Sequence, residues 1–86
     1  MPRLSEFYGI VIAMFYEDHP PPHFHAIYAG QRAVIGVDPI IVRESRLPRR
    51  ALSLVLEWAA LHQAELRDNW QRTRQHLPLQ PIEPLD

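Results

Sequence analysis

Three consecutive prolines at positions 20–22 are the strongest constraint that this sequence places on its fold. Each proline fixes φ and lacks a backbone N–H, so residues 17–22 cannot lie inside a β-sheet and must connect two elements. The residues before them, 7–16, are apolar on both alternating faces and rich in β-branched and aromatic side chains. This pattern favours one ten-residue strand in the centre of a sheet over a buried helix.

The rest of the chain predicts short strands followed by one helix. The strands are expected over residues 23–29, 32–37 and 40–44, with turns at Gly30-Gln31 and Asp38-Pro39. From Arg49 to about His76, apolar residues recur with helical periodicity, and Pro48 suits the first position of a helix. We therefore expect an α+β fold, in which a small antiparallel sheet of three to four strands carries one long C-terminal helix on one face.

The last residues differ in composition from the rest. Prolines occupy positions 78, 81 and 84, and Leu79, Ile82 and Leu85 recur with the same spacing. A polyproline II helix has three residues per turn, so the apolar residues would share one side. We expect a single domain over residues 1–77 and a proline-rich tail over residues 78–86. The tail could pack on the domain, bind a partner or fray.

Composition narrows the class of protein. The chain has no cysteine, so any metal would be bound by nitrogen and oxygen ligands. The net charge of −1 gives no general attraction to nucleic acid, although Arg43, Arg46, Arg49 and Arg50 form a basic patch that could hold phosphates. No apolar run approaches the roughly 20 residues that cross a bilayer, and the first residues do not resemble a signal peptide. We expect a cytoplasmic protein without membrane association.

Histidines cluster around the prolines. His23 and His25 are two residues apart on a predicted strand, so both side chains leave the same face and could share one metal ion. Asp18 and His19 precede them on the stiff loop, and His62 lies on a flank of the predicted helix that could meet this face. We name His23, His25 and His62 as candidate ligands of a divalent transition metal such as zinc, with His19 as a further candidate. The candidate catalytic groups are Asp18, His19 and His23, with Asp18 as either base or ligand.

Three other interpretations of the histidines stay open. The rings can recognise a partner or ligand. A pair of imidazoles can transfer protons without a metal, because the imidazole pKa lies near 6.5. Histidines can also be structural, each ring packing on a neighbour and bonding to a backbone carbonyl.

A contact surface is also predicted on the helix. Leu54 and Leu61 lie opposite the apolar stripe that would face the sheet. Together with Arg46, Arg49 and Arg50 they are the candidate residues for binding a partner or a second copy of the chain. The alternative is an ordinary surface, because isolated exposed leucines are common on proteins.

Several motifs together are similar to those of a known family. DH-x-PPHFHA begins at Asp18, LPRRAL begins at Leu47, and LEWA-x-LH, EL and NW follow. In this combination, over nearly the whole chain, the sequence resembles the bacterial DUF4160 proteins, a family without a settled activity. The chain departs from the family pattern at Pro20, where a polar residue is expected. The matching positions are Asp18, His19, Pro21, Pro22, His23, Phe24, His25, Pro48, Trp58, His62 and Trp70.

The resemblance implies a protein partner. DUF4160 proteins are often encoded beside a DUF2442 protein, in two-gene units similar to toxin–antitoxin modules. Our first hypothesis is therefore a small cytoplasmic protein of such a module that binds a DUF2442-type partner, with the histidines near its functional face. The alternative hypothesis is a metal-dependent hydrolase, a nuclease acting as the toxin, that uses the histidine cluster. The sequence leaves open whether the protein is an enzyme.

Overall fold

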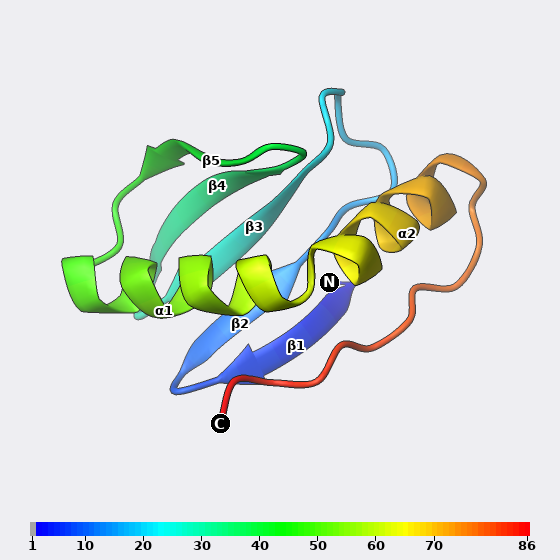
Figure 1. The fold of residues 1–86 in the computed structure, drawn as a ribbon. Helices are drawn as coiled ribbons and strands as arrows, with labels where there is room; N and C mark the ends of the chain where they lie inside the picture. Colours follow the sequence, from blue (N-terminus) through cyan, green and yellow to red (C-terminus); the bar gives the residue numbers. More distant parts are fainter. Residues whose placement is uncertain (1) are drawn as a thin grey trace.

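The computed structural model describes residues 2–86, which form a two-layer α+β fold. Five strands make one antiparallel sheet in the order β1-β2-β3-β4-β5, and both helices cover the same face of it (Figure 1). This confirms the α+β class. The elements are β1 (Arg3–Phe7), β2 (Ile10–Ala13), β3 (His23–Tyr28), β4 (Gln31–Val37), β5 (Ile40–Ser45), α1 (Arg49–Leu61) and α2 (Gln63–Arg74).

The single strand expected over residues 7–16 is wrong, because a tight turn at Tyr8-Gly9 divides this region between β1 and β2. Both turn residues have positive φ, 51° and 79°, and Phe7 pairs with Ile10 across the turn. Positive φ at both central positions defines the hairpin turn whose twist matches that of the strands. The second hairpin turn, Ala29-Gly30, has nearly the same conformation, with φ of 50° and 78°. The sheet therefore has five strands instead of three to four.

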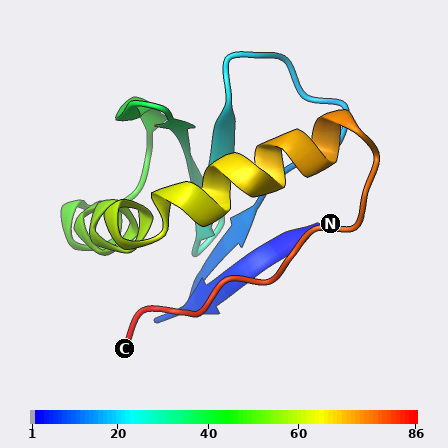
Figure 2. The ribbon, with the colours of Figure 1, turned by 45° about the vertical axis from the view of Figure 1, so that its right-hand side comes forward.

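The single long helix is also corrected, because the chain breaks into α1 and α2 at His62. The backbone of His62 has φ −122° and ψ 26°, outside the helical range, although its N–H still bonds to the carbonyls of Trp58 and Ala59. The helix axis changes direction at this point (Figure 2). Gln63 anchors the break by donating a hydrogen bond to the carbonyl of Val37, at 2.9 Å. The bend allows both helices to follow a twisted sheet.

The core lies between the sheet and the helices and is centred on Trp58. This side chain is fully buried, and its ring centroid lies 5.5 Å from that of Phe7 and 5.8 Å from that of Phe24. The packing joins α1 to both β1 and β3, so it fixes the helix across the sheet.

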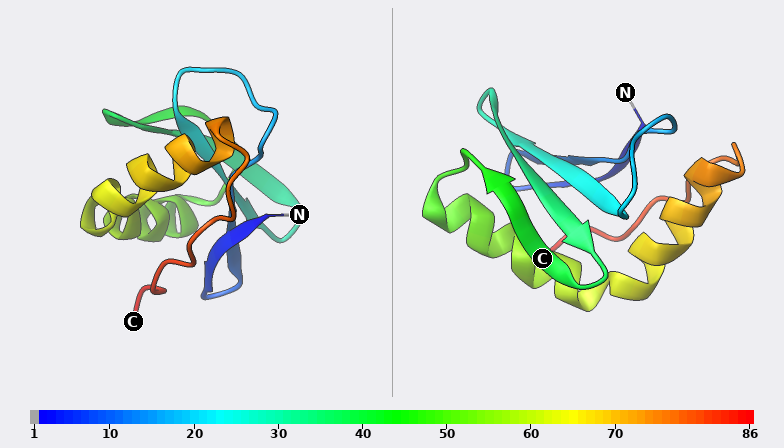
Figure 3. Two further views of the ribbon diagram at one scale, coloured as in Figure 1. Left: turned by 90° about the vertical axis from the view of Figure 1, so that its right-hand side faces the viewer. Right: turned by 90° about the horizontal axis from the view of Figure 1, so that it is seen from above.

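The proline-rich tail packs on the domain and runs beside β1 (Figures 1 and 3). Ile82 is buried, and its N–H donates to the carbonyl of Leu4 at 2.8 Å. The fully buried Asn69 forms two bonds with the backbone of Gln80, donating at 3.0 Å and accepting at 2.8 Å. The indole N–H of Trp58 donates to the carbonyl of Glu83 at 2.8 Å. The tail thus connects both helices to β1.

Neither helix in residues 2–86 has the length and apolar character that crossing a membrane requires.

Candidate metal centre

Asp18, His23 and His25 form one cluster where the proline-containing loop returns to the sheet at β3. Nε2 of His23 lies 2.8 Å from Oδ2 of Asp18, and Nε2 of His25 lies 2.9 Å from the same oxygen. One ligand atom of each residue lies within 4.8 Å of the other two. The ring centroids of the two histidines are 5.3 Å apart, as expected for alternate residues on one face of a strand.

The ring of His23 is held in one orientation. Its Nδ1 lies 2.8 Å from the carbonyl oxygen of Pro21, and the ring packs on Trp70 of α2 with a centroid distance of 5.4 Å. Because a carbonyl oxygen can only accept, Nδ1 carries the proton of this bond. In a neutral ring, Nε2 then presents its lone pair to Asp18. Metal-binding histidines characteristically use such a bond to set their tautomer.

The carboxyl group of Asp18 is ionised at neutral pH. Burial is the largest single influence on its pKa and raises it, but hydrogen bonds from His25, from the backbone N–H of His19 and from His23 together outweigh burial. The pKa therefore falls from 3.8 to about 2. An ionised carboxylate and a neutral His23 would direct two lone pairs at each other over 2.8 Å, so a proton or a metal cation must lie between them.

His25 completes the cluster at the solvent side. Its ring lies edge-on to Phe15, with centroids 4.8 Å apart, and its Nδ1 is buried without a hydrogen-bond partner among residues 2–86. An unpaired buried polar group costs about 1–3 kcal/mol. An ion bound at Nε2 of His25 would not supply a partner for Nδ1, so this cost is independent of metal binding.

The donor set fits a divalent transition metal. Two imidazole nitrogens and one carboxylate oxygen suit zinc or iron(II), and tetrahedral ligand atoms about 2.0–2.1 Å from one ion lie about 3.3–3.4 Å apart. The separations of 2.8 and 2.9 Å are hydrogen-bond distances, so these atoms would move apart by about 0.5 Å to hold an ion. Three protein ligands leave coordination positions free for water or substrate. A hollow of about 320 Å³, lined by Phe15, Glu17, Asp18 and His25, gives access to the cluster.

The chain matches the sequence model of one known protein family. Residues 9–71 match the sequence model described as "Domain of unknown function (DUF4160)", which covers most of the chain. The chain belongs to the DUF4160 family. No curated protein and no solved structure matches it. The matched region of this DUF4160 protein contains the whole Asp18–His23–His25 cluster and α1, and it ends inside α2.

Two predicted histidines do not join the cluster. His19 is exposed and touches Asp18 only through its backbone N–H. His62 sits at the break between the helices, where its Nδ1 lies 2.6 Å from Oε1 of Glu65 and its ring packs on Trp58. The expected convergence of His62 with the strand histidines is therefore corrected, and the residue that lies beside them is Asp18.

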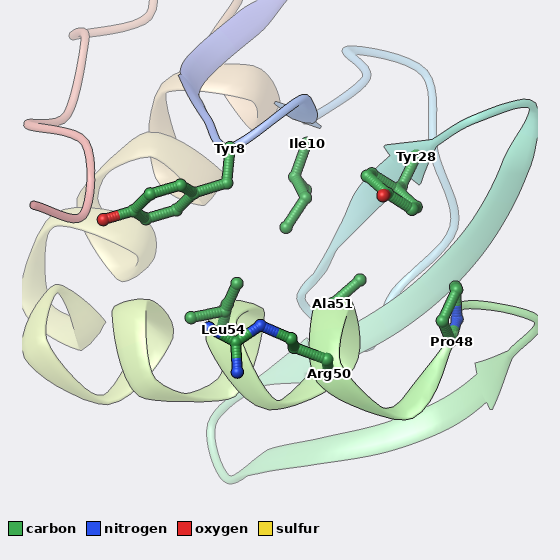
Figure 4. A pocket seen from close by; sticks show the side chains of 7 residues that line it. All are labelled: Tyr8, Ile10, Tyr28, Pro48, Arg50, Ala51 and Leu54. Carbon is green, nitrogen blue, oxygen red and sulfur yellow. The ribbon is translucent and has the colours of Figure 1, made fainter.

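The predicted partner-binding residues lie toward the two ends of α1 and, for Arg46, just before it. Leu54 and Arg50 border a hollow of about 280 Å³ between the start of α1 and the first hairpin (Figure 4). Tyr8, Ile10 and Tyr28 form its opposite wall (Figure 4). Leu61 lies at the other end of the helix and is 67% exposed. The arginines at positions 46, 49 and 50 are all exposed near the start of α1.

One residue beside the cluster is not marked by any pattern in the sequence. Arg74 donates a hydrogen bond to the carbonyl of Tyr16 at 3.0 Å, although the two residues are 58 positions apart. Its guanidinium group lies 4.3 Å from the ring centroid of Trp70, the same indole that packs on His23. No local motif could have identified Arg74, because only the folding of α2 onto the loop brings it to this place.

Proposed function

We propose that this DUF4160 protein is a metal-dependent hydrolase in which Asp18, His23 and His25 hold one divalent transition metal ion. The observation that carries the proposal is the contact between Nε2 of His23 and Oδ2 of Asp18. Nδ1 of His23 donates to the carbonyl of Pro21, which leaves Nε2 as the atom that can bind a cation beside the Asp18 carboxylate. A cation between these two atoms satisfies both of them, and His25 presents its Nε2 to the same point.

The ion would supply a Lewis acid and lower the pKa of the water that it binds. The chain's own residues would position it and shape the approach. Pro21 and Trp70 fix the His23 ring, while Phe15 borders the open side. Glu17 lines the same hollow with an exposed carboxylate, which suits it to accept a proton from the attacking water.

Metal analysis of protein purified without an affinity tag tests this proposal. We expect about one transition metal ion per chain in the wild type, and loss of that ion in Asp18→Asn and His23→Ala. His19→Ala is the matched control, because its side chain is exposed and makes no hydrogen bond within residues 2–86. Hydrolytic activity should follow metal content across these variants. Wild-type protein without stoichiometric metal, and equally active with and without a chelator, would overturn the proposal.

A second candidate function is binding of a protein partner in a two-gene module. The hollow of Figure 4 favours it, because Tyr8 is 58% exposed beside apolar side chains and Arg50. An apolar patch next to a cation is typical of protein interfaces. The family resemblance implies a DUF2442-type partner for such a surface.

Native pull-down with the neighbouring gene product tests partner binding. Tyr8→Asn removes the exposed ring, and asparagine tolerates the positive φ at this position. We expect Tyr8→Asn to weaken co-purification and Leu77→Asn, an exposed leucine beyond the end of α2, to leave it unchanged. A wild-type monomer that binds nothing would refute this function without affecting the metal proposal.

A further inference from the structure

A second hollow adjoins the candidate metal centre on the side of α2. Its volume is about 180 Å³, and Asp18 and Glu17 line both this hollow and the first one. The two hollows therefore share Glu17 and Asp18 along their common border. The remaining lining residues of the second hollow are Tyr16, Thr73, Arg74 and His76.

Arg74 is the fixed cation of this hollow. Its Nη2 donates to the carbonyl of Tyr16 at 3.0 Å, its Nε lies 3.5 Å from Oγ1 of Thr73, and its guanidinium group stacks over Trp70. Within residues 2–86 it forms no ion pair with a carboxylate, whereas Arg67 and Arg72 of the same helix each have an aspartate partner. A guanidinium has five N–H donors, so several of them remain free. A stacked arginine with free donors is well suited to bind two oxygens of a phosphate group.

The other side of the hollow is an aromatic wall. The rings of His76 and Tyr16 are nearly parallel, with an angle of 6° and a centroid distance of 6.3 Å. Nε2 of His76 lies 3.9 Å from Oε2 of Glu17, and both side chains are largely exposed. Tyr16 is itself anchored, since its hydroxyl donates to the carbonyl of Leu77 at 2.8 Å.

The charges facing the hollow make anion binding depend on the metal. Asp18 and Glu17 contribute two negative charges, which exceed the single positive charge of Arg74. A divalent ion bound at Asp18, His23 and His25 would reverse this balance. An anion in this hollow would then face two cationic groups, the ion and Arg74.

We infer that the substrate of the proposed hydrolase carries a phosphoryl group, which the metal ion and Arg74 hold between them. This inference rests on the proposed metal site. In such a reaction the oxygen of water bonds to phosphorus, and the bond from phosphorus to the leaving oxygen breaks. The water loses one proton and the leaving oxygen gains one. Arg74 would bind the non-bridging oxygens and so orient the group for in-line attack.

Binding of inorganic phosphate to metal-loaded protein tests the inference. The protein is loaded with cobalt(II), and phosphate binding is followed by calorimetry and by the visible spectrum of the ion. We expect Arg74→Gln to weaken phosphate binding about 10–100-fold, as for loss of a charge-assisted hydrogen-bond pair, with cobalt affinity unchanged. Arg67→Gln on the same helix is the control and should bind phosphate as the wild type does. Arg74→Lys keeps the charge but loses the planar group over Trp70 and the paired donors, so it should show a smaller loss than Arg74→Gln.

The possible failures are distinguishable. If Arg74→Gln binds phosphate as tightly as the wild type, the inference is wrong and the metal site stands. If metal-free protein binds phosphate as tightly as loaded protein, the shared site is wrong. If the wild type binds no cobalt, the proposed function fails first. If Arg74→Gln loses cobalt as well as phosphate, Arg74 supports the fold of the loop instead of contacting the anion, which also overturns the inference.

Discussion

Replacing Asp18 with asparagine should remove part of the acid sensitivity of the fold. In the folded protein the pKa of Asp18 is about 2, against an ordinary 3.8, because hydrogen bonds from His25, the His19 backbone and His23 outweigh the effect of burial. As the pH falls, the unfolded chain binds the proton first. The stabilisation is therefore complete above about pH 4 and is lost as the pH falls toward 2.

The size of the effect follows from the two pKa values. One pKa unit corresponds to about 1.4 kcal/mol, so the change from 3.8 to about 2 sets an upper value of about 2.5 kcal/mol of unfolding free energy. The Asp18 side chain is 23% exposed, so solvent screens part of this contribution. Asparagine has nearly the same shape but does not titrate, and all other carboxyl groups cancel in the comparison. The difference in stability between wild type and Asp18→Asn should thus shrink by about 1–2 kcal/mol between pH 5 and pH 2.

Urea unfolding followed by tryptophan fluorescence measures this difference, at pH 5, 4, 3 and 2 with a chelator present. Asp38→Asn is the control, because Asp38 is exposed and its contact with Arg67 is long, at 3.4 Å. Exposed pairs of this kind contribute about 0–1 kcal/mol, so the control should follow the wild type. A difference between wild type and Asp18→Asn that does not change with pH would show that the histidines do not hold Asp18 ionised.

Three further predictions concern the metal, the tail and the sheet edge. Zinc at about 100 times its dissociation constant should stabilise the wild type by about 2.7 kcal/mol. This stabilisation should raise Tm by about 10–20 °C. His23→Gln should abolish the rise in Tm, and His62→Gln should retain it. An equal zinc response in both variants would argue against the cluster as the binding site. Asn69→Ala should lower the free energy of unfolding in urea by about 2–4 kcal/mol, because it leaves the N–H and the carbonyl of Gln80 without their partner. A loss below about 1 kcal/mol would mean that these bonds do not hold the tail. Gly36→Ala should lower stability by about 1–3 kcal/mol in thermal unfolding, since its Cβ would lie 2.9 Å from Ile41 and 3.1 Å from the carbonyl of Pro39, and a neutral result would show that β5 moves freely away.

The parts of the fold that have strong local signals could be predicted from the sequence. Proline chemistry identified the loop over residues 17–22, and alternation identified β3 and β4 to within a residue or two. The turn at Tyr8-Gly9 was missed although Gly9 is a turn signal, because tyrosine rarely adopts positive φ and the residues on both sides are apolar. The break at His62 was missed for a different reason: no glycine or proline marks it, and the shape of the twisted sheet decides where the helix bends.

The residues of the site that are close together in the sequence could be predicted, and those that are far apart could not. His23 and His25 share a face because of strand alternation, which the sequence shows directly. Asp18 reaches them through the path of the loop, and the sequence indicates only that it lies nearby. His62 was chosen from its angle around the helix, yet that angle says nothing about position along the sheet, and Trp70 occupies the place beside His23 instead. Arg74 depends on contacts between α2 and the loop that only the folded structure reveals.

A crystal structure grown with zinc, using anomalous scattering to locate the ion, tests the metal centre most directly. We expect one zinc ion about 2.0–2.1 Å from Nε2 of His23, Nε2 of His25 and a carboxylate oxygen of Asp18, with Nδ1 of His23 still bonded to the carbonyl of Pro21. A zinc ion bound elsewhere, or a cluster in which His23 and Asp18 remain directly hydrogen-bonded at saturating zinc, would contradict the proposed site.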